Sequence, residues 1–426
     1  MIHRSPRITE VRRHTLHVPF TAGTAQWNAL LVGQWGVVEL VEVRTEDPDI
    51  TGWGESVPAY TSRTVSDEAI SSLVGERAAE YLWDARLGMG LQMALFDAVG
   101  KQLQVPMSRL LNLPVVRDAA PIAWWSTKMP PEALAAEAER AVASGYRAHK
   151  FKARPWFDPF EQVDAVARVT PNDYRLDIDW NRMLLDRPTA LRVLGRLDEH
   201  PKVGIFEAPM ADGNFDDYRL LRERLRHPIV EHFDQGPFAP GALAHAYDGY
   251  VFSPNTQGEG VGGLLRQGIL AEAFNKSGWM QMVGTALTTA FTLHLTSVLP
   301  AARWPLVTAM NIYQDDLATA PIRIADGLAH VPDGPGLGVD VDTSTIERFA
   351  VDHGHRIDYP RTILSLSLPG GGIREYTTMA QMWRDCREYG NVPLTGEGAR
   401  LSVRADDGST DFDREHRALT NRPRWR

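Results

Sequence analysis

The chain has 426 residues, of which 43% are hydrophobic and 23% are charged, and its formal net charge is −9 at pH 7. The length predicts two domains, one of them large, and the composition is that of a globular protein. No basic block occurs in the sequence, which argues against nucleic-acid binding.

Neither secretion nor a membrane span is expected. The single cysteine, Cys386, excludes an intrachain disulfide and suits a reducing compartment, so we expect a cytoplasmic protein. Residues 1–16 carry charges throughout and lack the apolar centre of a signal peptide. Residues 277–302 contain no Lys, Arg, Asp or Glu. Their glycine and proline breaks and hydroxyl side chains nevertheless favour a buried strand and a buried helix over a membrane span.

The first 120 residues predict a small α+β domain. Alternation of apolar and polar residues indicates strands within residues 7–20, 27–47 and 52–56. Residues 87–104 repeat apolar side chains at a spacing of three to four, which indicates a helix.

From residue 121 short apolar strands alternate with amphipathic helices. The strand candidates are "PIAWWST", "AHKFKAR", "YRLDIDW", "KVGIFEA", "PIVEHFD", "GYVFS", "WMQMV" and "LVTAM". Eight strands with helices between them predict an α/β fold, a (β/α)8 TIM-like barrel over residues 121–310. Turn-rich residues 311–394 are predicted to return to the first domain and complete it as a cap. Residues 395–426 are polar and are predicted to form a loosely packed or extended tail.

In such a barrel the active site lies at the carboxyl ends of the strands. The polar residues at the predicted ends of strands two to five are Lys150, Lys152, Asp179, Asn181, Glu207, Glu231, His232 and Asp234. Lys152, Asp179, Glu207 and Asp234 follow one another at spacings of 27, 28 and 27 residues. One βα unit separates each from the next, so we expect them at equivalent heights on neighbouring strands.

These residue types predict a metal-assisted reaction. Carboxylates on adjacent strand ends repel one another unless a cation lies among them, and three oxygen ligands suit octahedral Mg²⁺. Lys150 and Lys152 flank one phenylalanine, so both ammonium groups face the same side of a strand, roughly 7 Å apart. A lysine beside a metal and another ammonium has a lowered pKa and can act as a general base. We therefore expect a proton to be removed α to the carboxylate of a small acid, with Mg²⁺ stabilising the dianion.

The order K-x-K, D-x-N and E-A-P resembles the enolase superfamily, in the branch of mandelate racemase and muconate-lactonising enzymes. The segments "GWGES", "MALFDAVGKQLQVPMSRLLN" and "VPDGPGLGVDVD" extend the resemblance to about residue 350. It implies that Lys152 is the base and that Lys150 assists it or holds the substrate carboxylate. It also implies that Asp179 and Glu207 are metal ligands with Asn181 nearby, and that the protein is a homo-oligomer.

The chain departs from the family pattern on the later strands. The third metal ligand is usually Glu or Asp, whereas "PIVEHFDQ" offers Glu231, His232 or Asp234. We assign Asp234 to the metal and His232 to catalysis, and the choice stays open. Strand six lacks the lysine of the muconate subgroup, and strand seven lacks the histidine of the racemase subgroup. The acidic position of strand eight corresponds to Asp315 or Asp316.

Substrate contacts are predicted from the remaining strand ends and loops. Besides Asn181 and Asp315, they are Trp124 at the end of strand one and Asn255 and Gln257 on loop six. Barrel aromatics and turn-forming amides are also common without such a role. Residues 18–28 have two interpretations, a loop that closes over the barrel mouth or an ordinary hairpin connection.

One base is sufficient to eliminate water, whereas racemisation needs a base on each face of the α-carbon. We therefore expect a Mg²⁺-dependent dehydratase, a hydro-lyase, that acts on a hydroxy or sugar acid. The departing hydroxyl would be protonated by His232, Asp315 or a metal-bound water. The alternatives are a racemase, epimerase or cycloisomerase of the same superfamily, and a catalytically weakened member that only binds a carboxylate.

Overall fold

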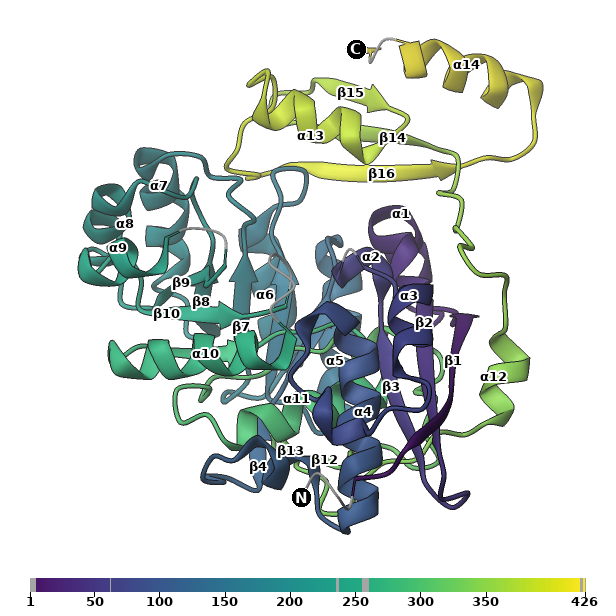
Figure 1. Ribbon diagram of the computed structural model, residues 1–426. Coiled ribbons are helices and arrows are strands. Elements are labelled where there is room, and N and C mark those ends of the chain that lie inside the picture. Colours follow the sequence, from purple (N-terminus) through teal and green to yellow (C-terminus); the bar gives the residue numbers. More distant parts are fainter. Residues whose placement is uncertain (1–4, 62, 235–236, 255–259, 422–423, 426) are drawn as a thin grey trace.

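The computed structural model describes residues 5–61, 63–234, 237–254, 260–421 and 424–425. Figure 1 shows an antiparallel N-terminal sheet beside a barrel of parallel strands, with a second antiparallel sheet above them at the C-terminal end of the chain. The α/β class and the TIM-like barrel are therefore confirmed.

The N-terminal sheet has the strand order β1 (Ile8–His17), β2 (Val37–Thr45), β3 (Thr51–Ser56), and helix α4 (Met89–Leu103) packs on it. Short helices α2 (Pro58–Thr61) and α3 (Asp67–Leu73) lie between sheet and α4 in the sequence. The helix approaches β3 so closely that a Cβ atom on Gly54 would lie 1.9 Å from the carbonyl oxygen of Gly90. The "GWGES" segment thus allows contact between backbones that a larger residue would prevent.

One predicted strand of this domain, within residues 27–47, is wrong over nearly its first half. Residues 27–32 lie in helix α1 (Ala25–Val32), and β2 begins only at Val37. The run "ALLV" is short and apolar, and periodicity cannot distinguish helix from strand in such a run. Residues 18–24 therefore connect β1 to α1 and residues 25–28 begin that helix, so the segment is not a simple hairpin connection.

Seven parallel strands form the barrel sheet, in the order β11-β10-β9-β8-β7-β6-β5. Their bounds are β5 Ala123–Ser126, β6 Ala148–Lys152, β7 Arg175–Asp179, β8 Val203–Glu207, β9 Ile229–His232, β10 Gly249–Phe252 and β11 Ser277–Met280. The helices between and after them are α5 Pro131–Ala143, α6 Pro159–Val169, α7 Arg187–Leu197, α8 Phe215–Arg222, α9 Phe238–Leu243, α10 Gly260–Ala273 and α11 Ala286–Ser297. Proline in the first turn and an aspartate cap fix the starts of α6 and α7.

The eighth predicted strand, "LVTAM", closes the barrel without forming a regular strand. Leu306 makes a parallel bridge to Ile122, and Val307 makes one to Gln281. The amide of Ala123 donates to Leu306 and that of Met282 donates to Val307, each at 2.9 Å. These residues therefore join the two edges, β5 and β11, of the seven-stranded sheet.

Residues 277–302 are core, as predicted. They form β11 and α11, and every residue of α11 is buried against the rest of the protein. Among the helices that the structure describes, none is long and apolar enough to cross a membrane.

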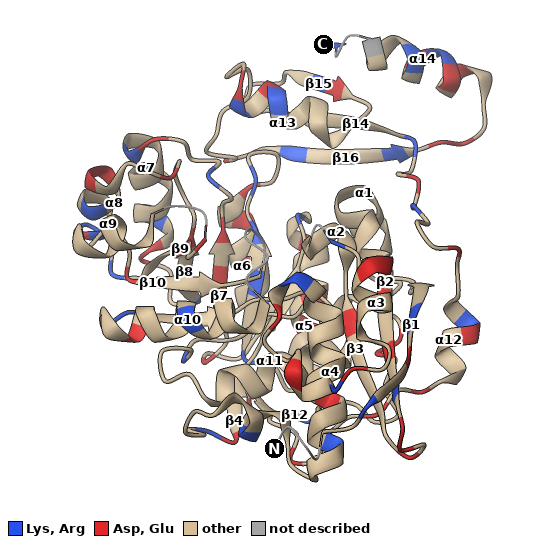
Figure 2. Ribbon diagram, in the orientation of Figure 1, with Lys and Arg blue, Asp and Glu red and all other residues tan. Residues whose placement is uncertain are grey.

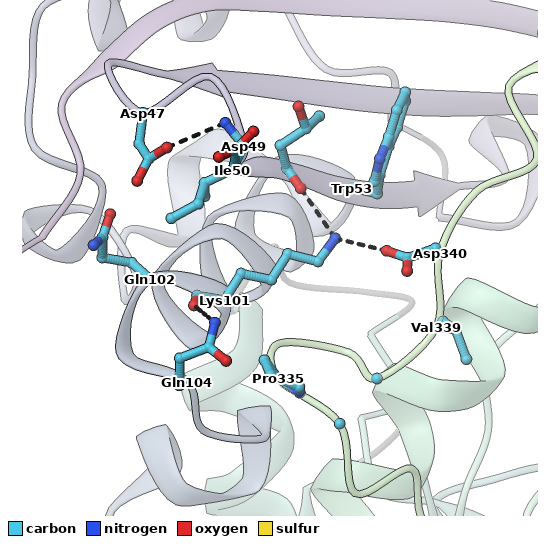
Figure 3. Close-up of a pocket in the computed structure, with 13 residues that line it drawn as sticks. Asp47, Asp49, Ile50, Trp53, Lys101, Gln102, Gln104, Pro335, Val339 and Asp340 are labelled. Carbon is cyan, nitrogen blue, oxygen red and sulfur yellow. Dashed lines mark hydrogen bonds and ion pairs between the residues drawn. The ribbon is translucent and has the colours of Figure 1, made fainter.

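Residues 334–340 contact the N-terminal domain, while the predicted return of residues 311–394 to that domain stays a prediction. The buried Asp97 of α4 accepts hydrogen bonds from the amides of Trp53 and Leu337, each at 2.8 Å. The same segment lines an open pocket of about 610 Å³ with β3 and the end of α4. There Lys101 points between the carbonyl oxygen of Thr51 and the carboxylate of Asp340 (Figure 3). Short strands β4 (Ala119–Pro121), β12 (Ile324–Ala325) and β13 (Leu328–His330) form a small sheet, and α12 spans Ser344–Phe349.

The C-terminal unit, defined here as residues 362–425, has its own sheet in the order β16-β14-β15-β17. Its elements are β14 Thr362–Ser367, β15 Ile373–Tyr376, α13 Met379–Arg387, β16 Arg400–Ala405, α14 Thr410–Asn421 and β17 Arg424–Trp425. Its apolar side chains share one cluster with Trp27 of α1 and with Met129, Trp156, Phe157 and Met183. The last four lie on the loops that follow β5, β6 and β7, so the unit covers that side of the barrel mouth (Figure 1).

The expected extended tail at residues 395–426 is therefore replaced by β16, α14 and β17. These elements are mostly polar, but each of β16 and α14 buries apolar side chains that pack in the C-terminal unit. The buried side chains are Leu401, Phe412 and Leu419. The boundaries predicted at residues 120, 310 and 394 stay predictions.

Candidate active site

Lysines and carboxylates come together at the carboxyl ends of β6, β7 and β8. Lys152 pairs in register with Asp179, and Asp179 pairs with Glu207. The spacing of 27 and 28 residues thus gives equal height on neighbouring strands, and Figure 2 shows the acidic ends of β7 and β8 side by side.

The two lysines are bound to the two carboxylates. Lys152 forms an ion pair with Asp179, and Lys150 forms one with Glu207 while lying 3.8 Å from Asp179. Lys150, Asp179 and Glu207 are fully buried, whereas the Lys152 side chain is 13% exposed. Lys152 is therefore the lysine that a molecule entering from the mouth can reach.

The surroundings shift the pKa values of this group in opposite directions. Burial lowers the pKa of Lys152, because its charged form loses hydration, and the charge of Lys150 lowers it further against the attraction of Asp179. Burial alone would raise the pKa of Asp179, but the charges of Lys152, Lys150 and Arg154 hold it well below its usual range. A lysine that loses its proton more readily thus lies beside a carboxylate that stays ionised.

The end of β9 places its three candidate ligands differently. His232 faces the site, with Nε2 at 3.1 Å from Oε1 of Glu207. Glu231 is turned away and bound by Arg182 at 3.1 Å. Asp234 lies farther along the chain, 4.0 Å from Nδ1 of His232. The residue beside Glu207 is therefore an imidazole and not a third carboxylate.

Asn181 lies next to Asp179 and is held by a residue that the sequence analysis did not identify. The backbone N–H of Asn181 donates to Oδ1 of Asp179 at 2.8 Å. Arg154 donates to the side-chain oxygen of Asn181 and to the carbonyl oxygen of Asp179. Arg154 follows the K-x-K motif by two residues, so proximity to that motif was the only signal for it.

The N-terminal domain also reaches the site. Lys150 donates to the side-chain oxygen of Gln281, and Gln281 donates to the hydroxyl of Tyr60 at 3.4 Å. The ring of Trp35 lies 5.5 Å from that of Tyr60 and 5.1 Å from that of Trp125. Gln281 ends strand seven of the barrel and could have been found from that position. Trp35 and Tyr60 carry no such signal, because they come from another domain.

Two predicted substrate contacts lie elsewhere. Trp124 faces outward and donates to Glu137 of α5 at 2.9 Å, since Trp125 is the residue in register with Lys150. Asp315 is bound by Arg348 at 2.9 Å and lines, with Trp124, a separate surface pocket. Asn255 and Gln257 lie outside the described residues.

Asp179 and Glu207 fit a divalent cation. Both are buried on adjacent strand ends, and among the described residues Oε2 of Glu207 has no hydrogen-bond partner with suitable geometry beyond its ion pair with Lys150. Carboxylate oxygens are the ligands that Mg²⁺ prefers. In the described part of the chain, no three His, Cys, Asp or Glu residues converge as a complete ligand set. The identity of the third ligand stays a prediction.

Comparison with known proteins gives concordant matches. The model of the enolase C-terminal domain-like family matches residues 133–345. A chloromuconate cycloisomerase from Cupriavidus pinatubonensis is 28% identical over 282 residues, which cover 63% of this chain and 73% of the relative. An arabinonate dehydratase from Saccharolobus solfataricus is 25% identical over 350 residues, covering 73% and 91%.

A solved structure shares the fold. The enolase from Thermobispora bispora, complexed with magnesium and formate, superimposes with a TM-score of 0.65 at 20% identity, covering 81% of this chain and 92% of its own. The family match spans half of the present chain and includes the strand ends that carry the lysines and carboxylates. The chain therefore belongs to the enolase superfamily, in the branch of mandelate racemase and muconate-lactonising enzymes, as its sequence motifs predict.

Proposed function

We propose that the protein is a dehydratase that converts a 2,3-dihydroxy carboxylic acid to a 2-keto acid by proton abstraction α to the carboxylate. One observation carries the proposal: Lys152, paired with Asp179 and 13% exposed, is the lysine of the strand-end group that a substrate can reach. Burial also lowers its pKa. The opposite side of the barrel has Gln281 at the end of strand seven, and residues 253–260 contain no lysine. A single base fits elimination better than racemisation.

The chain's own residues supply the proton transfers. The neutral amine of Lys152 takes the proton from the α-carbon. The hydroxyl group on the β-carbon leaves with a proton as water, and the resulting enol rearranges to the 2-keto acid. His232, which faces the site beside Glu207, is the proposed donor to that hydroxyl. Lys150, buried between Glu207 and Gln281, supports Lys152 from within the site and holds Glu207 in place.

Enzymes of this superfamily bind Mg²⁺. We propose that Asp179 and Glu207 hold it here, with Asp234 as the third ligand. When bound, the ion supplies positive charge for the oxygens of the substrate carboxylate, which favours loss of the α-proton.

The relatives leave the reaction class open, since they include a cycloisomerase and a dehydratase. The cycloisomerase keeps isomerisation as the alternative within the same chemistry.

The proposal is tested by incubating the protein with Mg²⁺ and a library of hydroxy and sugar acids in D₂O. Formation of a 2-keto acid and α-deuteration of recovered substrate are measured together. We expect keto acid from at least one compound, and we expect Lys152→Ala to reduce its formation by at least about 10²-fold. Deuteration without keto acid would replace the proposal by racemisation or isomerisation. Keto-acid formation that survives Lys152→Ala would remove Lys152 as the base.

A further inference from the structure

The C-terminal unit holds the loop that follows β6, the strand that carries both lysines. The backbone N–H of Gly398 donates to Oδ2 of Asp158 in this loop at 2.7 Å. Gly396 lies so close to the loop that a Cβ atom on it would be 2.7 Å from the carbonyl oxygen of Phe157. The family match ends at residue 345, so these contacts come from a part of the chain beyond that match.

Trp383 of α13 extends this contact to a buried cation. The centre of its ring lies 5.4 Å from the guanidinium carbon of Arg154 and 6.3 Å from the ring centre of Trp156, both in the same loop. Arg154 is 1% exposed, and within the described residues its hydrogen bonds go to uncharged oxygens. An aromatic face attracts a guanidinium and orders it, because the face of the ring carries partial negative charge. Trp383 therefore holds Arg154 in one position.

Arg154 fixes which way the side chain of Asn181 points. A guanidinium can only donate hydrogen bonds, so the atom of Asn181 that faces it is the amide oxygen. Nδ2 of Asn181 then points at Asp179, 3.3 Å from Oδ2, while the backbone N–H donates to Oδ1. The backbone of Asn181 is left-handed, with φ of 43°. Both oxygens of the Asp179 carboxylate thus receive a hydrogen bond from Asn181.

The bonds to Asp179 matter because this carboxylate is a proposed ligand of the metal. Hydrogen bonds from surrounding residues orient a ligating carboxylate, and losing one such partner typically weakens metal binding by about 10- to 100-fold. Asn181 supplies two of these bonds, and Arg154 decides whether its side chain can supply the second. The position of Arg154 therefore affects how well Asp179 binds a cation.

We propose that Trp383 is a positioning residue for the metal site, which holds Arg154 and thereby orients Asn181 and the carboxylate of Asp179. This inference rests on the proposed function, which assigns Asp179 to Mg²⁺. The C-terminal unit thus contributes to the affinity of the metal site as well as covering one side of the barrel mouth. Trp383 changes neither the number nor the charge of the ligands, so it acts on their orientation alone.

The test measures metal binding by the full chain and requires no turnover. Mn²⁺ is the probe, because it suits the same octahedral oxygen ligands as Mg²⁺, and the electron paramagnetic resonance signal of the free ion gives the dissociation constant. We expect Trp383→Ala to weaken Mn²⁺ binding about tenfold. Trp383→Phe keeps an aromatic face over Arg154 and should stay within about twofold of the wild type. Tyr389→Ala, at a ring of the same unit that is 65% exposed, is the matched control and should bind as the wild type does.

A double-mutant cycle separates positioning from a general loss of stability. Arg154→Lys keeps the charge but removes the planar fork, so it should weaken Mn²⁺ binding about tenfold by itself. Trp383→Ala should weaken binding no further when Arg154→Lys is already present. Its effect on thermal unfolding should persist in that background, because the contact with Trp156 is lost in either case. If Trp383→Ala does not fold, Trp383→Leu takes its place, since leucine packs on Trp156 but has no aromatic face.

Four results would overturn the positioning role: no Mn²⁺ binding by the wild type at millimolar concentration, wild-type affinity in folded Trp383→Ala, an equal loss in Tyr389→Ala, or a loss that Arg154→Lys leaves undiminished. The D₂O measurement separates this inference from the proposed function. Keto acid formed by the wild type, with normal Mn²⁺ binding by Trp383→Ala, would retain the function and reject the positioning role. Weakened Mn²⁺ binding by Trp383→Ala, with no reaction of any acid, would do the opposite.

Discussion

At the scale of single residues, His149 shows how the barrel wall sets a proton affinity. It lies in β6 beside Lys150 but faces outward, bonded to Ser126 at 2.8 Å and packed edge-on against Tyr174. Burial lowers its pKa from 6.5 to about 3. The unfolded chain therefore binds this proton at a higher pH than the folded chain. Stability linked to His149 is complete above about pH 6.5 and is lost as the pH falls toward 3.

This linkage predicts the effect of His149→Gln, which can keep a hydrogen bond to Ser126 but does not titrate. Between pH 7 and pH 5 the wild-type free energy of unfolding should fall by about 2 kcal/mol more than that of the variant. Urea unfolding at the two pH values measures the difference. His353→Gln, at an exposed position, should follow the wild type. Identical pH dependence in both proteins would mean that the pKa of His149 is the same in the folded and unfolded chain.

At the scale of elements, Glu55 joins the N-terminal sheet to the barrel. It lies at the end of β3, fully buried, and accepts four hydrogen bonds from the amides and hydroxyls of Thr285 and Thr288. These donors form the first turn of α11, where unpaired N–H groups favour a negative charge. One carboxylate thus satisfies the amino end of a buried helix in another domain.

Glu55→Ala should lower the free energy of unfolding by about 2–4 kcal/mol, because it leaves several buried donors without an acceptor. Glu55→Gln should lower it less, since an amide oxygen still accepts some of them. Chemical denaturation checks both, with Glu272→Ala at an exposed site of α10 as the control. A loss no larger than that of the control would show that water replaces the carboxylate.

The elements also show what the sequence could and could not predict. The alternation of strands and helices located the barrel, and the constant length of the βα unit placed Lys152, Asp179 and Glu207 in register. The sequence did not show which of Trp124 and Trp125 faces the interior of the barrel. In the strand "AWWS" no polar residue marks the inner face, and Trp124 was assigned to the wrong side. Tyr60 and Gln281 meet only through packing between domains, which no local pattern records.

At the scale of the whole molecule, the C-terminal unit, α1 and the loops after β5, β6 and β7 share one apolar cluster. Phe157 belongs to this cluster and is 1% exposed, with its ring edge-on to Trp27 of α1 at 5.7 Å. Gln34, just after α1, is hydrogen-bonded to Ile357 in the exposed segment 351–361 that leads to the C-terminal unit. Loosening the cluster should therefore release that segment together with α1.

Phe157→Ala should cost about 3–5 kcal/mol of stability, because it removes a large buried ring from a packed cluster. Cleavage by trypsin at Arg356 or Arg361 should then become faster under native conditions, before cleavage within the barrel, because local opening exposes the segment first. Mass spectrometry of early fragments identifies the cut, and Phe274→Ala, at a ring that is 36% exposed, is the control. If the folded Phe157→Ala variant were cut no faster than the control, the C-terminal unit would be held to the barrel by its polar contacts. The ion pair of Arg196 with Glu397 at 2.8 Å and the bond from the amide of Gly398 to Asp158 at 2.7 Å would then be the contacts to remove.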